Sequence, residues 1–227
     1  MSTRIGLLVP SSNTVVEADF YRNLPASATI HTARMLLETT TVEAEESMLD
    51  DYTFSAVRLL ATAKPDLVVF ACTSAGALRG NSYDADLCNR ITEISGVPTI
   101  SVIRSVQKIL GESSGGSVAV LTPYVDELNQ RIQASLEDDG FNVTAMHGMG
   151  ITTNFDIAQV EPSAIVEFAR ECFGSQPPAD SLFVSCTNFQ AVTARPMLQE
   201  LYGIPVVTSN QAALEAVRKE LSLEALM

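Results

Sequence analysis

Two short stretches of the chain place a cysteine and a threonine at the point where an apolar run ends. They read VFACTSAG at residues 69–76 and FVSCTNFQ at residues 183–190, and their thiols belong to Cys72 and Cys186. A thiolate is a nucleophile and a proton acceptor, and its acid form is a proton donor. Both stretches therefore carry groups that suit covalent or acid–base chemistry.

The residues that follow each thiol are rich in hydrogen-bond donors. Thr73, Ser74 and Thr187 suit a helix start or a loop whose hydroxyl and N–H groups hold a carboxylate. A position at a helix N-terminus also lowers the pKa of a thiol from its free value of about 8.5. Two thiols on opposite faces of one small acid would allow either of two reactions. One thiol removes a proton while the other delivers one, or one adds to an activated double bond while the other handles the proton.

Short apolar runs rich in β-formers alternate with longer segments of helical period, which is typical of βαβ units and parallel sheets. The pattern predicts eight strands, at Ile5–Val9, Ile30–Met35, Leu67–Ala71, Thr99–Ser101, Val118–Leu121, Val143–His147, Leu182–Ser185 and Val206–Thr208. Residues 42–63 are predicted to be helical, with Met48, Tyr52, Val57 and Leu60 near one face. The predicted fold class is therefore α/β.

Three landmarks recur in the same order at nearly constant spacing. Pro10 and Pro123 are 113 positions apart, and the two Cys-Thr pairs are 114 apart. The stretch GVPTIS begins at residue 96, and GIPVVT begins 107 positions later. The spacing predicts two copies of one four-stranded unit. The alternative is that the likeness reflects only features shared by all parallel strands.

This repeat predicts two pseudo-symmetric four-stranded parallel-sheet βα domains. Residues 1–100 plus 208–227 would form the first domain and residues 101–207 the second, with a flexible link in GESSGGS at 111–117. Ligands bind beyond the carboxyl ends of parallel strands. The active site is therefore predicted in the cleft between the domains.

Charge and hydropathy exclude several classes of partner. The formal net charge is −13, so neither nucleic acid nor an anionic membrane surface is expected as a partner. No apolar run approaches the roughly 18 residues that a membrane span needs, and the first residues lack a signal-peptide pattern. We therefore expect a cytoplasmic protein.

Sequence motifs for cofactors and metals are missing as well. The chain has no dinucleotide or phosphate-loop fingerprint and no CxxC pair, so we expect no cofactor and no metal. His31 and His147 fall in predicted strands. Cys88 and Cys172 fall in segments of helical pattern, and we interpret them as packing residues.

Several motifs together carry a family resemblance. They are VPSSN at residues 9–13, LTPY at 121–124, Asn154 and the two Cys-Thr pairs. With them the chain resembles the aspartate/glutamate racemase superfamily over nearly its whole length, in the maleate isomerase and arylmalonate decarboxylase branch. RIGLLVPSSNT is similar to the start of maleate isomerases, and the stretch from TSAGALRG to GIPVVTS is more similar to the decarboxylases.

The resemblance implies roles for named residues. Cys72 would add to an alkene as a thiolate and form a succinyl-cysteine-like adduct whose former double bond can rotate, and Cys186 would act as acid and base. Asn13, Tyr124 and Asn154 would hold carboxylates. It also implies that the C-terminal helix crosses back to the first half. Each of these three residues also has a purely structural interpretation. Asn13 would cap a helix, Tyr124 would pack on a helix start, and Asn154 would be an ordinary loop residue.

The predicted function is a cofactor-independent isomerase of a small dicarboxylic acid, with maleate to fumarate as the reference reaction. The first alternative is an amino-acid or hydantoin-type racemase that uses the thiols as two bases. A decarboxylase is a weaker alternative, because that branch has glycine where this chain has Cys72. A binding protein for small acids, with a hinged cleft and no chemistry, is the last. For any of the enzymes the resemblance implies a homo-oligomer.

Overall fold

The computed structural model describes residues 2–112 and 116–223, and its strands match the predicted ones. They are β1 (Thr3–Pro10), β2 (Ala28–Met35), β3 (Leu67–Phe70), β4 (Thr99–Ser101), β5 (Ser117–Thr122), β6 (Asn142–Gly148), β7 (Ser181–Val184) and β8 (Val206–Thr208). Two of them, β4 and β8, have the predicted bounds, and the others differ by one to two residues at an end. All eight strand predictions are confirmed.

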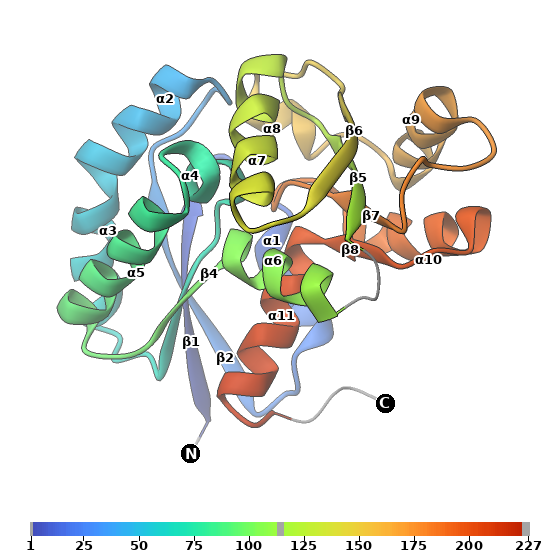
Figure 1. Cartoon of the computed structure of the whole chain (residues 1–227). Coiled ribbons are helices and arrows are strands. Elements are labelled where there is room, and N and C mark those ends of the chain that lie inside the picture. Colours follow the sequence, from blue (N-terminus) through green and yellow to red (C-terminus); the bar gives the residue numbers. More distant parts are fainter. Residues whose placement is uncertain (1, 113–115, 224–227) are drawn as a thin grey trace.

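The strands form two four-stranded sheets with the same order. The first sheet runs β2-β1-β3-β4 and the second runs β6-β5-β7-β8, and every pairing between these strands is parallel. Figure 1 shows the first sheet among the blue to green elements and the second among the light green to red ones. The repeated order confirms the predicted fold class, an α/β protein with two pseudo-symmetric four-stranded parallel sheets.

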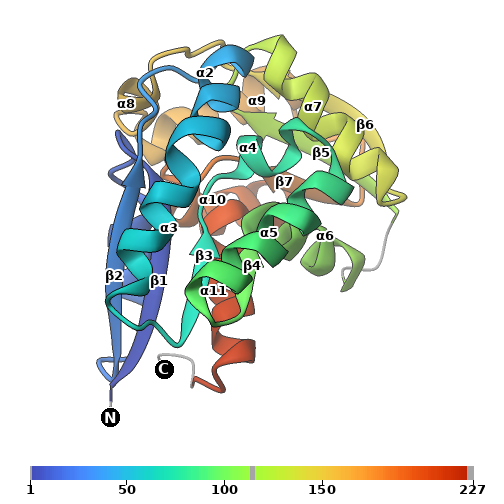
Figure 2. The same ribbon diagram turned by 90° about the vertical axis from the view of Figure 1, so that its left-hand side faces the viewer.

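Helices connect the strands in both halves. They are α1 (Val16–Asn23), α2 (Val42–Ser47), the π-helical turn η1 (Met48–Tyr52), α3 (Thr53–Ala61), α4 (Thr73–Leu78), α5 (Asn81–Ser95), α6 (Val102–Glu112), α7 (Asp126–Asp138), α8 (Asn154–Ile157), α9 (Pro162–Phe173), α10 (Ala191–Tyr202) and α11 (Ser209–Glu220). Figure 2 shows α2 and α4 beside each other at the upper end of the first sheet. Cys88 lies in α5 and Cys172 in α9, as predicted.

The central strands are buried along almost their whole length. All residues of β3 and β7 are buried, and β1 is buried from Ile5 to its end. The edge strands β2 and β6 are only partly buried. Parallel strands with helices on both faces need near-continuous apolar runs, and this explains why the sequence pattern located them.

The segment at residues 42–63 is helical, but the π-helical turn η1 interrupts its regular period. Met48, Val57 and Leu60 are fully or almost fully buried, as predicted. Tyr52 is 36% exposed, so its predicted place on the buried face was wrong. The wider turn inserts an extra residue into the helical period and rotates Tyr52 away from the core.

Helix α11 packs against the first half of the chain, although it follows the last strand of the second sheet. It contacts α1, α6 and β4, and its start is fixed by a capping box between Thr208 and Gln211. This crossing fits the predicted assignment of residues 208–227 to the first domain, and the domain bounds themselves remain a prediction. Residues 113–115 of the predicted link and 224–227 of that domain lie outside the described residues.

Within the described ranges, no helix combines the length and the apolar composition that crossing a bilayer requires.

Candidate active site

The predicted chemical residues lie at the carboxyl ends of the two central strands of each sheet. Asn13 follows β1 and Cys72 follows β3, whereas Tyr124 follows β5 and Cys186 follows β7. In the first sheet, β2 lies beside β1 on one side of this central pair, and β4 lies beside β3 on the other. In the second sheet, β6 and β8 flank β5 and β7 in the same way. Such a topological switch point is where parallel α/β sheets open a crevice for ligands.

The structure brings the two thiols into one buried cluster, although they come from different halves. Cys72 and Cys186 are each 4% exposed, and they lie near enough that a negative charge on Cys186 raises the pKa of Cys72. The hydroxyl group of Tyr124 interacts electrostatically with both and forms a hydrogen bond with Cys186. Burial raises the pKa of Tyr124 well above its usual value, so this phenol keeps its proton.

Cys72 is the residue that precedes α4, and its backbone is extended while the next residue is helical. Burial is the main cause that raises the pKa of its thiol, and the charge of Glu45 raises it further. The backbone N–H of Ala75 and the hydroxyl of Ser74 lower it. The net effect is a pKa well above the usual range, so the thiol is protonated near neutral pH.

Cys186 has a backbone φ of 101°, in the region that glycine favours. Strain of about 1–3 kcal/mol at one residue persists only where the surrounding structure enforces it, and such residues cluster at functional sites. Burial raises the pKa of the thiol to about 12, against the lowering effect of bonds from Tyr124 and from the N–H groups of Asn188 and Phe189. The Asn188 N–H lies 3.3 Å from the sulfur. Cys186 therefore has the larger set of donors but is still protonated near neutral pH.

Asn13 and Thr187 join the two halves next to the thiols. The Asn13 Nδ2 donates to the Thr187 hydroxyl at 3.0 Å, and that hydroxyl donates to the carbonyl of Ala71 at 3.0 Å. The Asn13 Oδ1 also accepts from the N–H groups of Val15 and Val16 at the start of α1. The side chain of Asn13 thus caps a helix and bridges the halves, and its contact with a substrate remains a prediction.

Asn154 and Thr73 make further bonds between segments distant in the sequence. The Asn154 Nδ2 donates to the Ser12 hydroxyl at 2.8 Å. The backbone carbonyl oxygen of Asn154 accepts from the Asn188 Nδ2 at 2.6 Å. The Thr73 hydroxyl donates to the Ser209 hydroxyl at 2.9 Å. All of the predicted substrate-binding residues therefore lie around the thiols, and their roles toward a substrate remain predictions.

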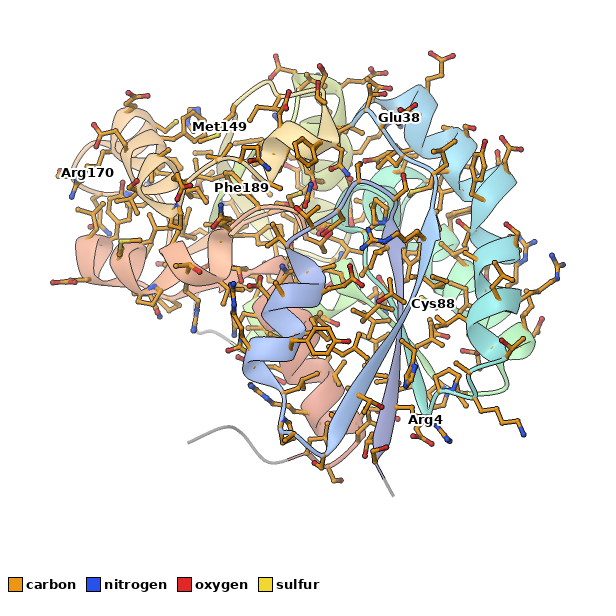
Figure 3. All side chains as sticks on the ribbon, turned by 180° about the vertical axis from the view of Figure 1, so that it is seen from behind. Arg4, Glu38, Cys88, Met149, Arg170 and Phe189 are labelled. Carbon is orange, nitrogen blue, oxygen red and sulfur yellow. The ribbon has the colours of Figure 1, made fainter. Side chains whose placement is uncertain are left out.

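Two loops close over the site from opposite halves. The loop after β2 and the loop after β6 meet in an antiparallel bridge between Thr39 and Thr153, and the Asn154 N–H donates to the carbonyl of Glu38 at 2.9 Å. Figure 3, which views the molecule from behind, shows Glu38 and Met149 on these loops at its upper edge. The bridge and this hydrogen bond tie the two halves together next to Asn154, one of the predicted site residues.

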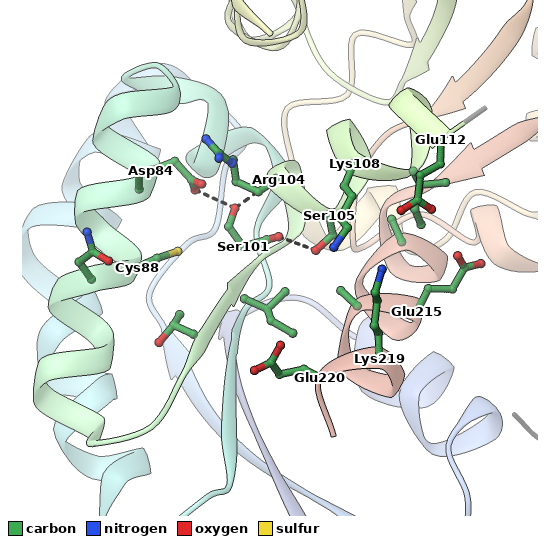
Figure 4. A pocket seen from close by; sticks show the side chains of 17 residues that line it. Asp84, Cys88, Ser101, Arg104, Ser105, Lys108, Glu112, Glu215, Lys219 and Glu220 are labelled. Atoms are coloured by element: carbon green, nitrogen blue, oxygen red, sulfur yellow. Dashed lines mark hydrogen bonds between the residues drawn. The ribbon is translucent and has the colours of Figure 1, made fainter. Parts of the chain in front are cut away.

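A cavity of about 520 Å³ lies elsewhere, between α5, α6 and α11. Figure 4 shows Cys88 on one side of it and Lys219 on the other. The predicted site residues, all of which the structure describes, do not line it. Burial raises the pKa of the Cys88 thiol to about 12, which suits the packing role predicted for it. Across the described ranges, no group of three or more His, Cys, Asp or Glu side chains could hold a metal ion.

Sequence reasoning missed two buried polar residues of the site, Glu45 and Ser209. The hydroxyl of Ser74 donates to the carboxyl group of Glu45, and the hydroxyl of Ser209 accepts from the Cys186 N–H at 3.0 Å. Glu45 precedes the apolar pair Met48 and Leu49 by three and four positions, and this spacing places an acidic side chain on a buried helix face. That signal was present in the sequence. Ser209 carries no comparable signal.

Gly148 is the last residue of β6 and lies against the loop of Tyr124. A Cβ atom there would lie 2.2 Å from the Tyr124 carbonyl oxygen and 2.4 Å from the Asn129 Nδ2. Gly148→Ala is therefore expected to displace this loop and to lower the free energy of unfolding by about 1–3 kcal/mol, measured by urea denaturation. Gly116→Ala is the control, because a Cβ there meets nothing within 4 Å. Equal stability of the two variants would contradict the expectation.

Fold and site together define a two-lobed α/β protein in which each lobe supplies one cysteine to a shared buried cluster. The chain belongs to the arylmalonate decarboxylase family, whose model matches residues 5–226. It is 28% identical to the arylmalonate decarboxylase of Bordetella bronchiseptica, over 94% of this chain and 89% of that protein.

Maleate isomerases are similar over the same length. The chain is 25% identical to the maleate isomerase of Nocardia farcinica, over 97% of this chain and 90% of that protein. The solved structure of the Nocardia farcinica maleate cis-trans isomerase bound to TRIS matches with a TM-score of 0.89 and 25% identity, over 97% of this chain and 93% of that one. The predicted resemblance to the maleate isomerase and arylmalonate decarboxylase branch is confirmed.

Proposed function

We propose that the protein is a two-cysteine isomerase of a small dicarboxylic acid, which converts maleate to fumarate without a cofactor. The observation that carries this proposal is the meeting of Cys72, Cys186 and Tyr124 in one buried cluster between the sheets. A reaction with a single nucleophile or a single base needs only one of these thiols. The similarity to maleate isomerases over nearly the whole chain supports the same reaction.

The proposed reaction begins with the thiolate of Cys72. Its sulfur forms a bond to one alkene carbon, and the π-electron pair moves to the other carbon, which takes a proton from the Cys186 thiol. The new carbon–carbon single bond rotates. Cys186, now a thiolate, removes the hydrogen of that carbon that faces it after the rotation, the carbon–sulfur bond breaks, and the electron pair re-forms the alkene as fumarate.

The surroundings of the thiols suit a dicarboxylate. The Tyr124 hydroxyl and the N–H groups at the start of α4 and after Cys186 are donors that could hold the carboxylates and the charge that moves onto them. In this proposal Asn13, Thr73, Ser74, Asn154 and Thr187 form the rest of the wall. The low exposure of Cys72, Cys186 and Tyr124 favours strong electrostatic interactions at this place.

Incubation of the protein with maleate, followed by proton NMR, tests the proposal. We expect the alkene signal of maleate to be replaced by that of fumarate without any added cofactor or metal. Persistence of maleate at high protein concentration would contradict the proposed reaction. Incorporation of solvent deuterium at the α-carbon of an amino acid, with maleate unchanged, would instead identify a racemase.

The family match favours a second candidate, decarboxylation of an arylmalonate. Among the relatives named above, the decarboxylase of Bordetella bronchiseptica has the higher identity, 28%. Phenylmalonate is the test substrate, and release of carbon dioxide together with phenylacetate would support this candidate. The presence of Cys72 beside Cys186 is the observation that places isomerisation first, because decarboxylation requires one proton donor only.

Assembly and location belong to the proposal as well. We expect a homo-oligomer, which light scattering coupled to size-exclusion chromatography measures directly. We also expect a cytoplasmic protein, because its thiols are free: all four cysteines are unpaired in the structure.

A further inference from the structure

Glu45 is a buried carboxyl group at the edge of the thiol cluster. Its exposed fraction is 0%, and it lies on α2, a helix that contributes none of the predicted site residues. One carboxyl oxygen accepts a hydrogen bond from the Ser74 hydroxyl. The other, Oε2, is buried and has no hydrogen-bond partner among the described residues. A buried carboxylate with an unsatisfied oxygen is costly, so this group has a strong tendency to take up a proton.

A chain of hydrogen-bonding groups connects Glu45 to Cys72. The Cys72 sulfur lies 3.8 Å from the Ser74 hydroxyl oxygen, and that hydroxyl donates onward to the Glu45 Oε1. Because the Ser74 proton points to Glu45, the serine oxygen can accept the proton of the Cys72 thiol. The three groups are thus aligned for a proton to leave the sulfur and a proton to arrive at the carboxylate.

The charges that face Glu45 come from three directions. Cys72, Cys186 and Tyr124 all interact with it electrostatically from the strand ends. Glu46 acts from α2 itself and forms an ion pair with Arg79, the residue that follows α4. Burial is the main cause that raises the pKa of Glu45 to about 8, against the hydrogen bond from Ser74. A carboxyl group with this pKa is a much stronger base than an ordinary carboxylate.

Cys72 needs such a base more than Cys186 does. The Cys186 sulfur is stabilised by Tyr124 and by two backbone N–H groups, whereas the Cys72 sulfur has the N–H of Ala75 and the hydroxyl of Ser74. Cys72 is only 4% exposed, so bulk water has little access to its proton. A buried group beside the thiol is therefore the suited acceptor.

We propose that Ser74 and Glu45 form a proton relay that takes the thiol proton of Cys72 within the buried cluster. This inference rests on the proposed function, in which Cys72 is the nucleophile. The Cys72 proton passes to the Ser74 oxygen as the Ser74 proton passes to Glu45, leaving a thiolate and a neutral carboxylic acid. One negative charge is present before and after the transfer. The protons return when the carbon–sulfur bond breaks.

Glu45→Gln is the first test, because the amide has the same shape and keeps a hydrogen bond with Ser74 but cannot take the proton. We expect kcat for maleate to fall about 100-fold, the size typical of a lost general base, with KM within about twofold. Glu46→Gln is the matched control on the neighbouring position, since it removes the same charge outside the relay, and we expect kcat within about threefold. A kcat of Glu45→Gln within threefold of the unaltered protein would overturn the relay.

Ser74→Ala tests the connection between the two ends. If the serine passes the proton, Ser74→Ala and Glu45→Gln should lower kcat by similar factors, and the double variant should lose no more than either alone. Losses that multiply in the double variant would overturn the relay, because independent groups contribute independently.

The pH dependence of Cys72 alkylation provides a readout without turnover. Iodoacetamide labelling of Cys72, quantified by peptide mass spectrometry, should rise with pH with a midpoint near pH 8 and level off above it, where Glu45 is ionised and the share of transferred proton becomes constant. In Glu45→Gln this inflection should disappear and the rise should continue. The same profile in both proteins would overturn the relay. This measurement also keeps the two proposals apart, because it holds even if maleate is not the substrate.

Discussion

Cys72→Ser is expected to lower maleate turnover by at least about 10³-fold, the largest effect of any single substitution in this protein. The structure gives the reason. A hydroxyl group is a much weaker acid than a thiol, and the burial that already raises the pKa of Cys72 would keep the serine proton in place. Progress curves of fumarate formation measure the loss, and circular dichroism verifies that the fold is kept.

Cys186→Ser should be inactive in a different way. The nucleophile is intact, so maleate can still add to Cys72 while water supplies the proton to the second carbon, but the base that must remove a proton from the adduct is missing. We expect intact-protein mass spectrometry to show a mass increase equal to one maleic acid, located on the Cys72 peptide. Turnover should fall by about 10²–10⁴-fold, the range for a lost acid–base group.

Cys88→Ser is the control for both variants, because Cys88 lines the remote cavity and not the thiol cluster. Its turnover should stay within about twofold. An adduct on Cys186 in the Cys72→Ser protein would reverse the two proposed roles. Full turnover in either cluster variant would remove the basis for a two-thiol reaction.

The parts of the fold that the sequence predicted well are those whose signal is local. Parallel strands such as β3 and β7 are continuous apolar runs, and the spacing between Pro10 and Pro123 revealed the repeat that the two strand orders confirm. The π-helical turn at Met48–Tyr52 has no such local signal. The sequence pattern assumed a regular helix here, so the prediction placed Tyr52 on the buried face, whereas Met48 and Val57 were assigned correctly.

The candidate site shows the same division. Cys72 and Cys186 were found because each stands at the end of a recognisable strand, and the topology then brings those ends together. The sequence analysis did not identify Glu45, because its importance depends on the packing of α2 against α4, a contact between segments far apart in the sequence. Asn13 was expected to bind substrate, yet its amide is already used to join the halves.

The duplicated fold also makes a stability experiment possible with two matched variants. Phe70 lies in β3 and Phe183 in β7, one in the central part of each sheet, and both are fully buried. Replacing either with alanine is expected to lower the free energy of unfolding by about 3–5 kcal/mol, the usual range for a buried Phe→Ala change.

We expect both variants to unfold in one cooperative transition. The halves share the α11 crossing, the bridge between Thr39 and Thr153 and the bond between Asn13 and Thr187, so damage to one sheet removes support from the other. Urea unfolding followed by far-UV circular dichroism measures the shift of the midpoint. Phe155→Ala is the control, since that ring is 51% exposed and its loss should change stability by less than about 0.5 kcal/mol. Two separated transitions in Phe70→Ala or Phe183→Ala would show instead that the halves unfold independently. The thiol cluster would then be held together by a weaker contact than these bonds imply.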